Sequence, residues 1–221
     1  MTQEALIPRM KRIDKSNNRL KIPFLSILFI VLALFMIIGS TFIGVDIKHY
    51  FLPRGAFFNN ALTKEDYIFT FYIIPQIPIL MFVCSTLGKK LATISVVLYL
   101  FLGFFMFPLF ALGGGITYFS EYGCGYLLAY LPAVVIVTSF LNKKYSFLYM
   151  FLAVLCGVLI IHFGGIVYMS LIALLKHEGA NFIFSWIEAQ SGLKIFYDII
   201  SSFILVLIGK YINVFVRFLL D

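Results

Sequence analysis

Charged side chains are scarce in this sequence. Asp, Glu, Lys and Arg make up 12% of its 221 residues, whereas hydrophobic residues make up 62% and the mean hydropathy is +1.02. A soluble domain of this length could not cover so much apolar surface. The shortage of charge therefore excludes a soluble globular protein. It predicts an all-α integral membrane protein with no soluble catalytic module attached.

Cysteine and histidine are also rare. The three histidines are isolated in the sequence and form no H-E-x-x-H pattern. The three cysteines form no C-x-x-C pair and lie in or beside apolar segments, at Cys84, Cys124 and Cys156. This spacing is typical of small buried residues and argues against a disulfide framework or a metal site. We therefore expect neither a metal nor a cofactor.

The net charge of +7 does not indicate a nucleic-acid partner, because the basic residues stand between apolar runs. In that position, charge sets the orientation of a chain in the bilayer. An even number of crossings places residues 1–21, Lys89–Lys90, Lys143–Lys144 and the Lys210–Arg217 end on one basic side. The acidic residues Glu121 and Glu178 then lie on the other side. This pattern predicts that both termini are cytoplasmic.

Six apolar runs are long enough to span a hydrocarbon layer. They cover residues 22–43, 67–87, 91–110, 125–141, 146–175 and 194–216. The first run is longer than the apolar part of a signal peptide and no A-x-A site follows it, so we expect a retained helix. The sequence thus predicts a basic segment, 1–21, and a single six-helix membrane domain, 22–221, in the cell membrane. Residues 176–191 form a polar interfacial connection that contains Trp186.

A glycine triplet, Gly113–Gly115, joins the third and fourth runs. Glycine adopts positive φ and lets the backbone approach a ligand closely, at an entropic cost that a simple turn does not require. Two interpretations are open: a loop that wraps a small ligand at the membrane surface, or a flexible turn.

Polar side chains within the apolar runs are candidate binding residues, because unpaired polar groups are costly at membrane depth. Gln76, between two prolines, is either an interhelical hydrogen-bonding residue or a ligand contact. Lys194 and Asp198 are four residues apart and share a helix face. Lys194 could instead extend to the membrane surface, or the two could form a buried pair. His162 fits an interhelical hydrogen bond better than a ligand contact.

Several stretches resemble the BioY family, the biotin-specific S components of energy-coupling-factor (ECF) vitamin transporters. Residues 88–103, GKKLATISVVLYLFLG, and residues 107–111, FPLFA, are similar to its central signature. Residues 121–130, EYGCGYLLAY, resemble its G-P-T-G-G-Y motif, and residues 162–168, HFGGIVY, its fifth-helix motif. Gln76 stands where the family has a glutamine.

The resemblance implies six helices and an outward-facing pocket for biotin. It also implies ECF-type ATPase subunits and a transmembrane coupling subunit as partners, so that the chain would not be an enzyme. Biotin needs hydrogen-bond donors and acceptors for its ureido ring, flat walls for its bicycle and a cation for its carboxylate. The expected ligand-binding residues are Gln76, Gly113, Gly114, Gly115, Tyr122, Tyr126, Lys194 and Asp198, with His162 and Arg54 as ligand or helix-packing candidates.

The sequence departs from the family pattern at the sixth helix, where P-G-D-x-x-K is expected. Here Gly192 is followed by Lys194 and Asp198, so that the base precedes the acid. The small-x-x-x-small pattern that would dock the coupling subunit is not evident in residues 22–38. An S component for another vitamin, such as riboflavin or thiamine, is the first alternative. A membrane enzyme is the second.

Overall fold

The computed structural model describes residues 24–50, 68–111, 113–142 and 146–220. Arg54 and the predicted basic segment 1–21 lie outside these residues. The elements, in chain order, are α1 (Phe24–Thr41), β1 (Val45–Tyr50), β2 (Ile68–Ile73), α2 (Gln76–Phe105), η2 (Ile116–Ser120), α3 (Cys124–Leu128), α4 (Tyr130–Leu141), α5 (Phe147–Leu175), α6 (Ala180–Ser191) and α7 (Lys194–Leu220).

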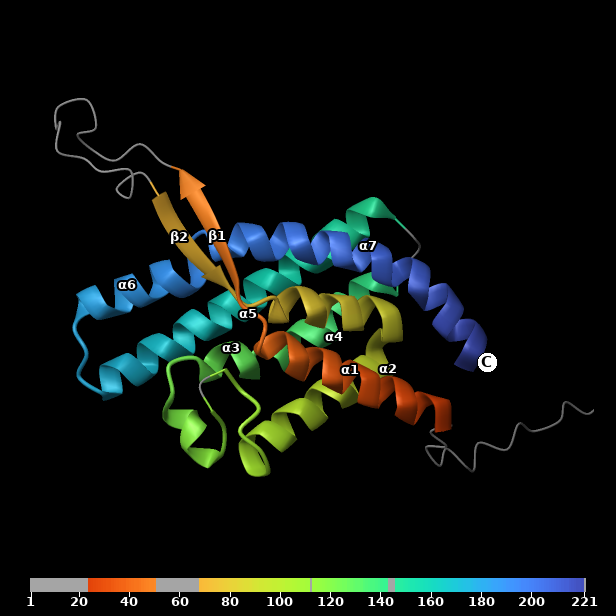
Figure 1. Cartoon of the computed structure of the whole chain (residues 1–221), viewed down its shortest axis with the longest axis horizontal. Helices are drawn as coiled ribbons and strands as arrows, with labels where there is room; N and C mark the ends of the chain where they lie inside the picture. The colour runs from red at the N-terminus through yellow and green to blue at the C-terminus, as the bar shows by residue number, and fades with distance from the viewer. Residues whose placement is uncertain (1–23, 51–67, 112, 143–145, 221) are drawn as a thin grey trace, which may run out of the picture.

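The described part of the chain is a bundle of apolar helices, as predicted (Figure 1). Five helical stretches are long and apolar enough to cross a membrane, when α3–α4 and α6–α7 are each counted as one. Many large apolar side chains on their outer faces are exposed, among them Phe35, Phe163 and Phe215. An outward-facing apolar surface of this kind is the expected counterpart of lipid.

A turn after the second predicted apolar run interrupts helix α2. Gly88 has φ 71° and ψ −176°, which is not a helical conformation. Figure 1 shows α2 turning back on itself between its two halves. The predicted second and third spans therefore fall within one element that is broken at this glycine.

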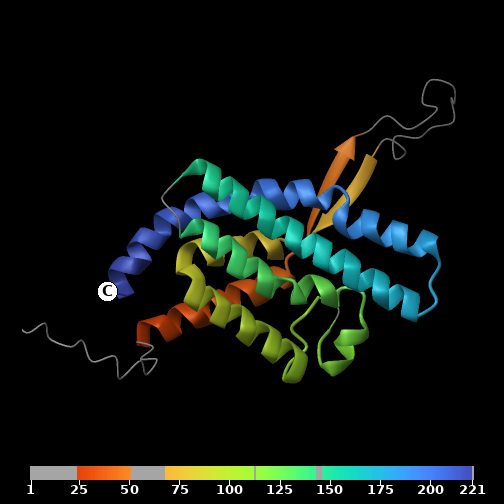
Figure 2. The same ribbon diagram turned by 180° about the vertical axis from the view of Figure 1, so that it is seen from behind.

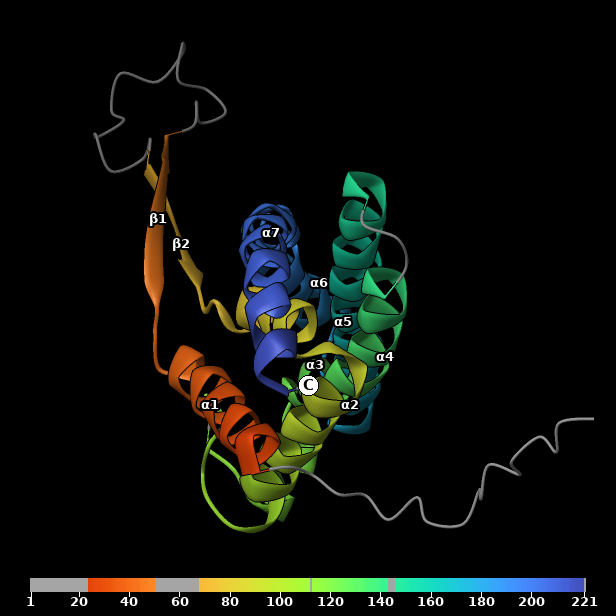
Figure 3. The same cartoon turned by 90° about the vertical axis from the view of Figure 1, so that its right-hand side faces the viewer.

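The first part of the predicted second span, 67–87, is wrong, because residues 68–73 form a strand. Strands β1 and β2 pair in antiparallel fashion, from Val45 opposite Ile73 to Tyr50 opposite Ile68. The run from Ile68 to Ile74 is rich in β-branched and aromatic residues, which favour strands. Pro75 then directly precedes the helix, where its missing N–H removes no helical hydrogen bond. Figures 1 and 3 show the hairpin projecting away from the helices.

Helix α7 is held against the bundle by polar bonds as well as apolar packing. The side chain of Asn213 donates from Nδ2 to the Thr86 carbonyl at 2.6 Å. Lys210 donates from Nζ to the Leu141 carbonyl, at the end of α4, at 2.5 Å. A Cβ at Gly209 would lie 1.9 Å from Oγ of Ser85, so α7 approaches α2 as closely as a glycine allows.

The two ends of the bundle differ in character. The start of α1, the turn within α2, the end of α4, the start of α5 and the end of α7 lie toward one end (Figures 1 and 2). The hairpin, η2 and α6 gather toward the other end. The glycine loop and the polar segment before α7 are therefore brought together, although about 70 residues separate them in the sequence.

We expect Gly88→Ala to lower the free energy of unfolding by about 1–3 kcal/mol, because only glycine adopts its φ and ψ without strain. Thermal unfolding of the purified protein in detergent measures the loss. Gly39→Ala is the matched control, since Gly39 lies within α1 and a Cβ there meets nothing within 4 Å. Equal stability of the two variants would contradict a requirement for glycine at the turn.

Candidate functional site

A cavity of about 680 Å³ lies where β2, the segment from Ala111 to η2, α3 and α6 meet the starts of α2, α4 and α7. This volume is in the range of small-molecule sites. Its wall combines aromatic rings with amide, carboxylate and ammonium groups. The lining residues are Thr70, Tyr72, Ile74, Gln76, Ile77, Ala111, Tyr118, Gly123, Tyr126, Leu127, Tyr130, Ser185, Trp186, Glu188, Ala189, Gln190 and Lys194.

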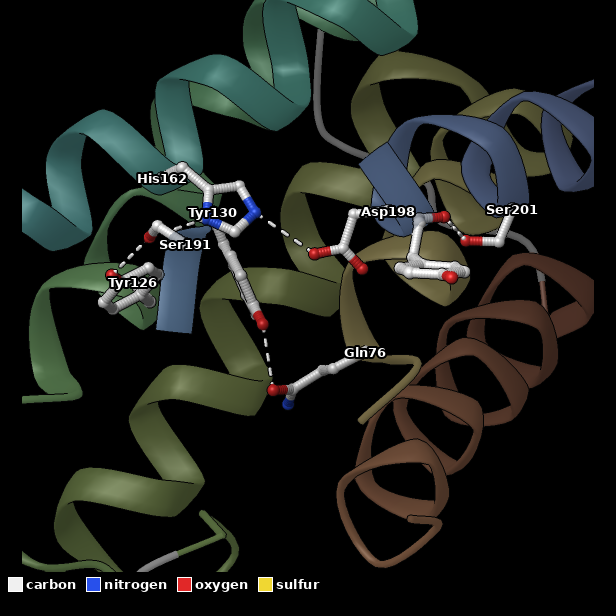
Figure 4. A network of polar contacts seen from close by, with 8 residues as sticks. Gln76, Tyr126, Tyr130, His162, Ser191, Asp198 and Ser201 are labelled. Carbon is white, nitrogen blue, oxygen red and sulfur yellow. Dashed lines mark hydrogen bonds and ion pairs between the residues drawn. The ribbon is translucent and has the colours of Figure 1, made fainter. Parts of the chain in front are cut away.

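Gln76, the first residue of α2, joins three helices at the cavity wall. Its Nε2 donates to Oγ1 of Thr41 on α1 at 2.9 Å and to the hydroxyl oxygen of Tyr99 at 2.7 Å. Its Oε1 accepts from the hydroxyl of Tyr130 on α4 at 2.9 Å (Figure 4). Gln76 is thus an interhelical hydrogen-bonding residue that also lines the cavity. Its contact with a ligand stays a prediction.

A second chain of polar contacts runs from the wall into the bundle (Figure 4). The Tyr126 hydroxyl lies 2.7 Å from Oγ of Ser191, and this Oγ lies 2.9 Å from Nδ1 of His162. Nε2 of His162 lies 3.1 Å from Oδ2 of Asp198. Ser191, the last residue of α6, thus joins α3 to α5, and His162 joins α5 to α7. His162 occupies the predicted interhelical position.

Asp198 is fully buried, and the side chain it contacts is His162, through Oδ2 and Nε2. The alternative predicted from spacing, a pair between Asp198 and Lys194, is not the contact that forms. Lys194 instead lines the cavity one helical turn earlier on α7. The other carboxylate oxygen, Oδ1, has no hydrogen-bond partner among the described residues. Figure 4 shows it pointing away from His162, toward the side on which Gln76 lies.

The glycine triplet folds onto the end of α2. Gly113 and Gly115 have positive φ, 116° and 87°. A Cβ at Gly114 would lie 2.7 Å from the Gly103 carbonyl oxygen, and the Gly115 N–H donates to the same oxygen at 2.9 Å. None of the three glycines lines the cavity, although Ala111 before them does. The triplet thus makes a close-packed turn, and its contact with a ligand stays a prediction.

Tyr122 braces α6 and is not part of the cavity lining. Its hydroxyl donates to Oε1 of Glu178 at 3.0 Å, and Nζ of Lys176 lies 4.3 Å from its ring centroid. Burial, together with the Glu178 carboxylate, raises the pKa of Tyr122. The protonated phenol therefore remains a donor to Glu178. The ring also packs against Phe182 and Trp186 of α6.

Several wall residues were missed by sequence reasoning. Thr70 and Tyr72 are two residues apart, so they share one face of the strand β2. The prediction of a helix over residues 67–87 concealed this two-residue spacing. Trp186 and Gln190 stand four apart and so share one face of α6. Helical spacing within the segment 176–191 could have identified that face.

These features define a class: a helical membrane protein with a polar-lined small-molecule cavity at one end of the bundle. The sequence model of the BioY family matches residues 62–218. The chain belongs to the BioY family.

The fold is similar to the crystal structure of the S-component for biotin from an ECF-type ABC transporter. The two chains share 22% sequence identity and a TM-score of 0.60, over 85% of this chain and 90% of the other. At this identity the likeness shows the fold. No protein of curated function matches the chain.

We expect Gln76→Ala to lower the free energy of unfolding by about 1–3 kcal/mol, because Tyr99 and Tyr130 lose their partner inside the bundle. Thermal or denaturant unfolding in detergent measures the loss. Gln190→Ala provides the control, since Gln190 lines the same cavity but is exposed. Unchanged stability of Gln76→Ala would contradict the bonding role.

Proposed function

We propose that this protein is the substrate-binding membrane subunit for biotin uptake, and that biotin occupies the cavity of about 680 Å³. Membership of the BioY family and the similarity to a biotin S-component support the proposal. The observation that carries it is the composition of the wall. Gln76 and Lys194 stand on one surface with the aromatic rings of Tyr126, Tyr130 and Trp186.

Each part of biotin has a matching group, either in this wall or, for Asp198, buried behind it. Lys194 supplies the cation for the carboxylate of the valerate tail. Tyr126 and Trp186, whose ring centroids lie 6.0 Å apart, supply flat faces for the fused rings. Asp198 Oδ1 is a buried acceptor without a described partner, and the two ureido N–H groups are suitable donors. Unpaired, that oxygen costs stability, so a ligand donor there would contribute to affinity.

We further propose a topology of six crossings, with the two halves of α2 counted separately. Residues 22–221 then form one membrane domain, and residues 1–21 and the C-terminus lie in the cytoplasm. Lys89, Lys90 and Arg217 flank the helix ends that gather at the same end of the bundle as the C-terminus, which agrees with the positive-inside rule. The cavity accordingly opens to the exterior of the cell membrane.

The partners follow from the same proposal. In an ECF transporter, ATPase subunits and a transmembrane coupling subunit supply the energy, and the S component captures the vitamin. This chain, as a carrier subunit, binds biotin without chemical change.

An S component for a different vitamin remains the second candidate. It is favoured by the reversed order of Lys194 and Asp198 and by Glu188, an acid on the cavity wall. A ligand with a cationic group would fit Glu188 better than biotin does.

We expect the purified chain in detergent to bind labelled biotin at a single site, and an excess of riboflavin or thiamine to leave the bound label in place. Equilibrium binding of labelled biotin in the presence of these competitors measures both the affinity and the displacement. Tight binding of one competitor with no binding of biotin would select the second candidate.

We expect Lys194→Gln to weaken biotin binding by about 1.5–3 kcal/mol, the usual range for a hydrogen bond to a charged group. The same variant should bind biotin and biotin amide equally, because the amide has no carboxylate to pair with Lys194. Lys90→Gln is the control, since this exposed lysine lies at the turn within α2. A Lys194→Gln variant that still prefers biotin over its amide would assign the carboxylate to another group.

A further inference from the structure

The polar chain Tyr126–Ser191–His162–Asp198 connects the cavity to a buried carboxylate. Of these four residues, Tyr126 alone lines the cavity. The other three are buried, with exposed fractions of 2% for Ser191, 1% for His162 and 0% for Asp198. Along this chain, a change of protonation at His162 can therefore reach the cavity wall at the hydroxyl oxygen of Tyr126.

A neutral His162 fixes every hydrogen in this chain in one direction. An ionised Asp198 can only accept, so the hydrogen of the neutral ring is on Nε2, and Nδ1 has a lone pair that accepts from the Ser191 hydroxyl. The oxygen of Ser191 then accepts from the Tyr126 hydroxyl. In this state Tyr126 has only acceptor capacity left for the cavity.

A protonated His162 reverses the chain. Both ring nitrogens now carry hydrogens, so Nδ1 donates to Ser191 Oγ. The Ser191 hydroxyl turns and donates to the Tyr126 oxygen. The hydrogen of Tyr126 is thereby released toward the cavity. One proton added inside the bundle thus converts Tyr126 from an acceptor into a donor on the wall.

The surrounding charges couple this reversal to the ligand. Asp198 is the counter-charge of the imidazolium, and Lys194, one turn away on α7, is a second cation on the same side. A ligand carboxylate bound to Lys194 offsets that second positive charge. The helices packed around His162 carry six titratable groups that bear on this reversal. They are Tyr126 of α3, Tyr130 of α4, Tyr99 of α2, Glu188 of α6, and Lys194 and Asp198 of α7.

We propose that the protein takes up one proton on His162 when it binds an anionic ligand, and that Ser191 and Tyr126 transmit this proton to the cavity as a hydrogen-bond donor for a ligand oxygen. The inference rests on the proposed function, in which the ligand is biotin. Because linkage is reciprocal, a proton taken up on binding makes the affinity rise as pH falls.

The test is calorimetric titration of the full chain in detergent with biotin at pH 6 and pH 8, in two buffers that differ in ionisation enthalpy. We expect binding at pH 6 to be at least about fivefold tighter, the lower end of usual coupling between two sites. The buffer dependence should report uptake of up to one proton per biotin near pH 7. The biotin carboxyl stays ionised over this pH range, since the pKa of a carboxyl group is about 4.

Ser191→Ala is the decisive variant, because it interrupts the chain while the His162–Asp198 pair remains. We expect its affinity for biotin to be the same at pH 6 and pH 8. His162→Gln should behave likewise, and Ser191→Ala carries the test if that variant does not fold. His177→Asn is the control: this exposed histidine lies between α5 and α6, has φ 58°, which asparagine tolerates, and should keep the wild-type pH dependence.

Two results would overturn the inference while biotin binding stands. One is equal affinity of the wild type at both pH values with no proton uptake. The other is a pH dependence that persists in Ser191→Ala, which would show that the titrating group acts on the ligand without the Ser191 link. Absence of biotin binding at both pH values would contradict the proposed function itself, so the two failures are distinguishable.

Discussion

The structure depends on one constraint: polar groups within an apolar bundle must find their partners inside it. Water is not at hand to replace a missing bond at that depth, and each unsatisfied group costs free energy. Gln76 meets the constraint by bonding to α1, to the second half of α2 and to α4. His162 meets it by bonding to Ser191 and Asp198. The same bonds fix how the helices are placed around the cavity.

The cavity lies beside the members of these networks that still have hydrogen-bonding capacity to spare. Tyr126 has one bond to Ser191 and a face on the cavity, whereas Asp198 has one oxygen bonded and one without a described partner. A ligand at such a position completes bonding that the protein has begun. Tyr122, outside the wall, holds α6 and its Trp186 in place through Glu178. In the proposed site, recognition thus combines polar groups already in position with an aromatic surface that Tyr122 holds in place.

Sequence reasoning reached the membrane class, the apolar helices and the BioY family, because these rest on composition, run length and local motifs. The fifth predicted apolar run, 146–175, agrees with the observed α5, Phe147–Leu175. It missed the hairpin, because residues 68–74 are apolar enough for a span and only their β-branched and aromatic content distinguishes them. It could not predict that Ser191 would bridge Tyr126 and His162, since that contact depends on how α6 returns to the bundle. A contact between side chains far apart in the sequence leaves no periodic pattern in a single sequence.

The hairpin has a consequence for the depth at which the protein rests in lipid. Among the described residues β1 and β2 form a two-stranded sheet, so each strand keeps one edge of peptide groups that no other strand covers. Open sheet edges do not occur in hydrocarbon, because their N–H and C=O groups would have no partners there. The hairpin must therefore remain in the aqueous or headgroup layer. Thr70 and Tyr72 belong both to the hairpin and to the cavity wall. The hairpin therefore keeps this end of the cavity at the boundary between the membrane and water.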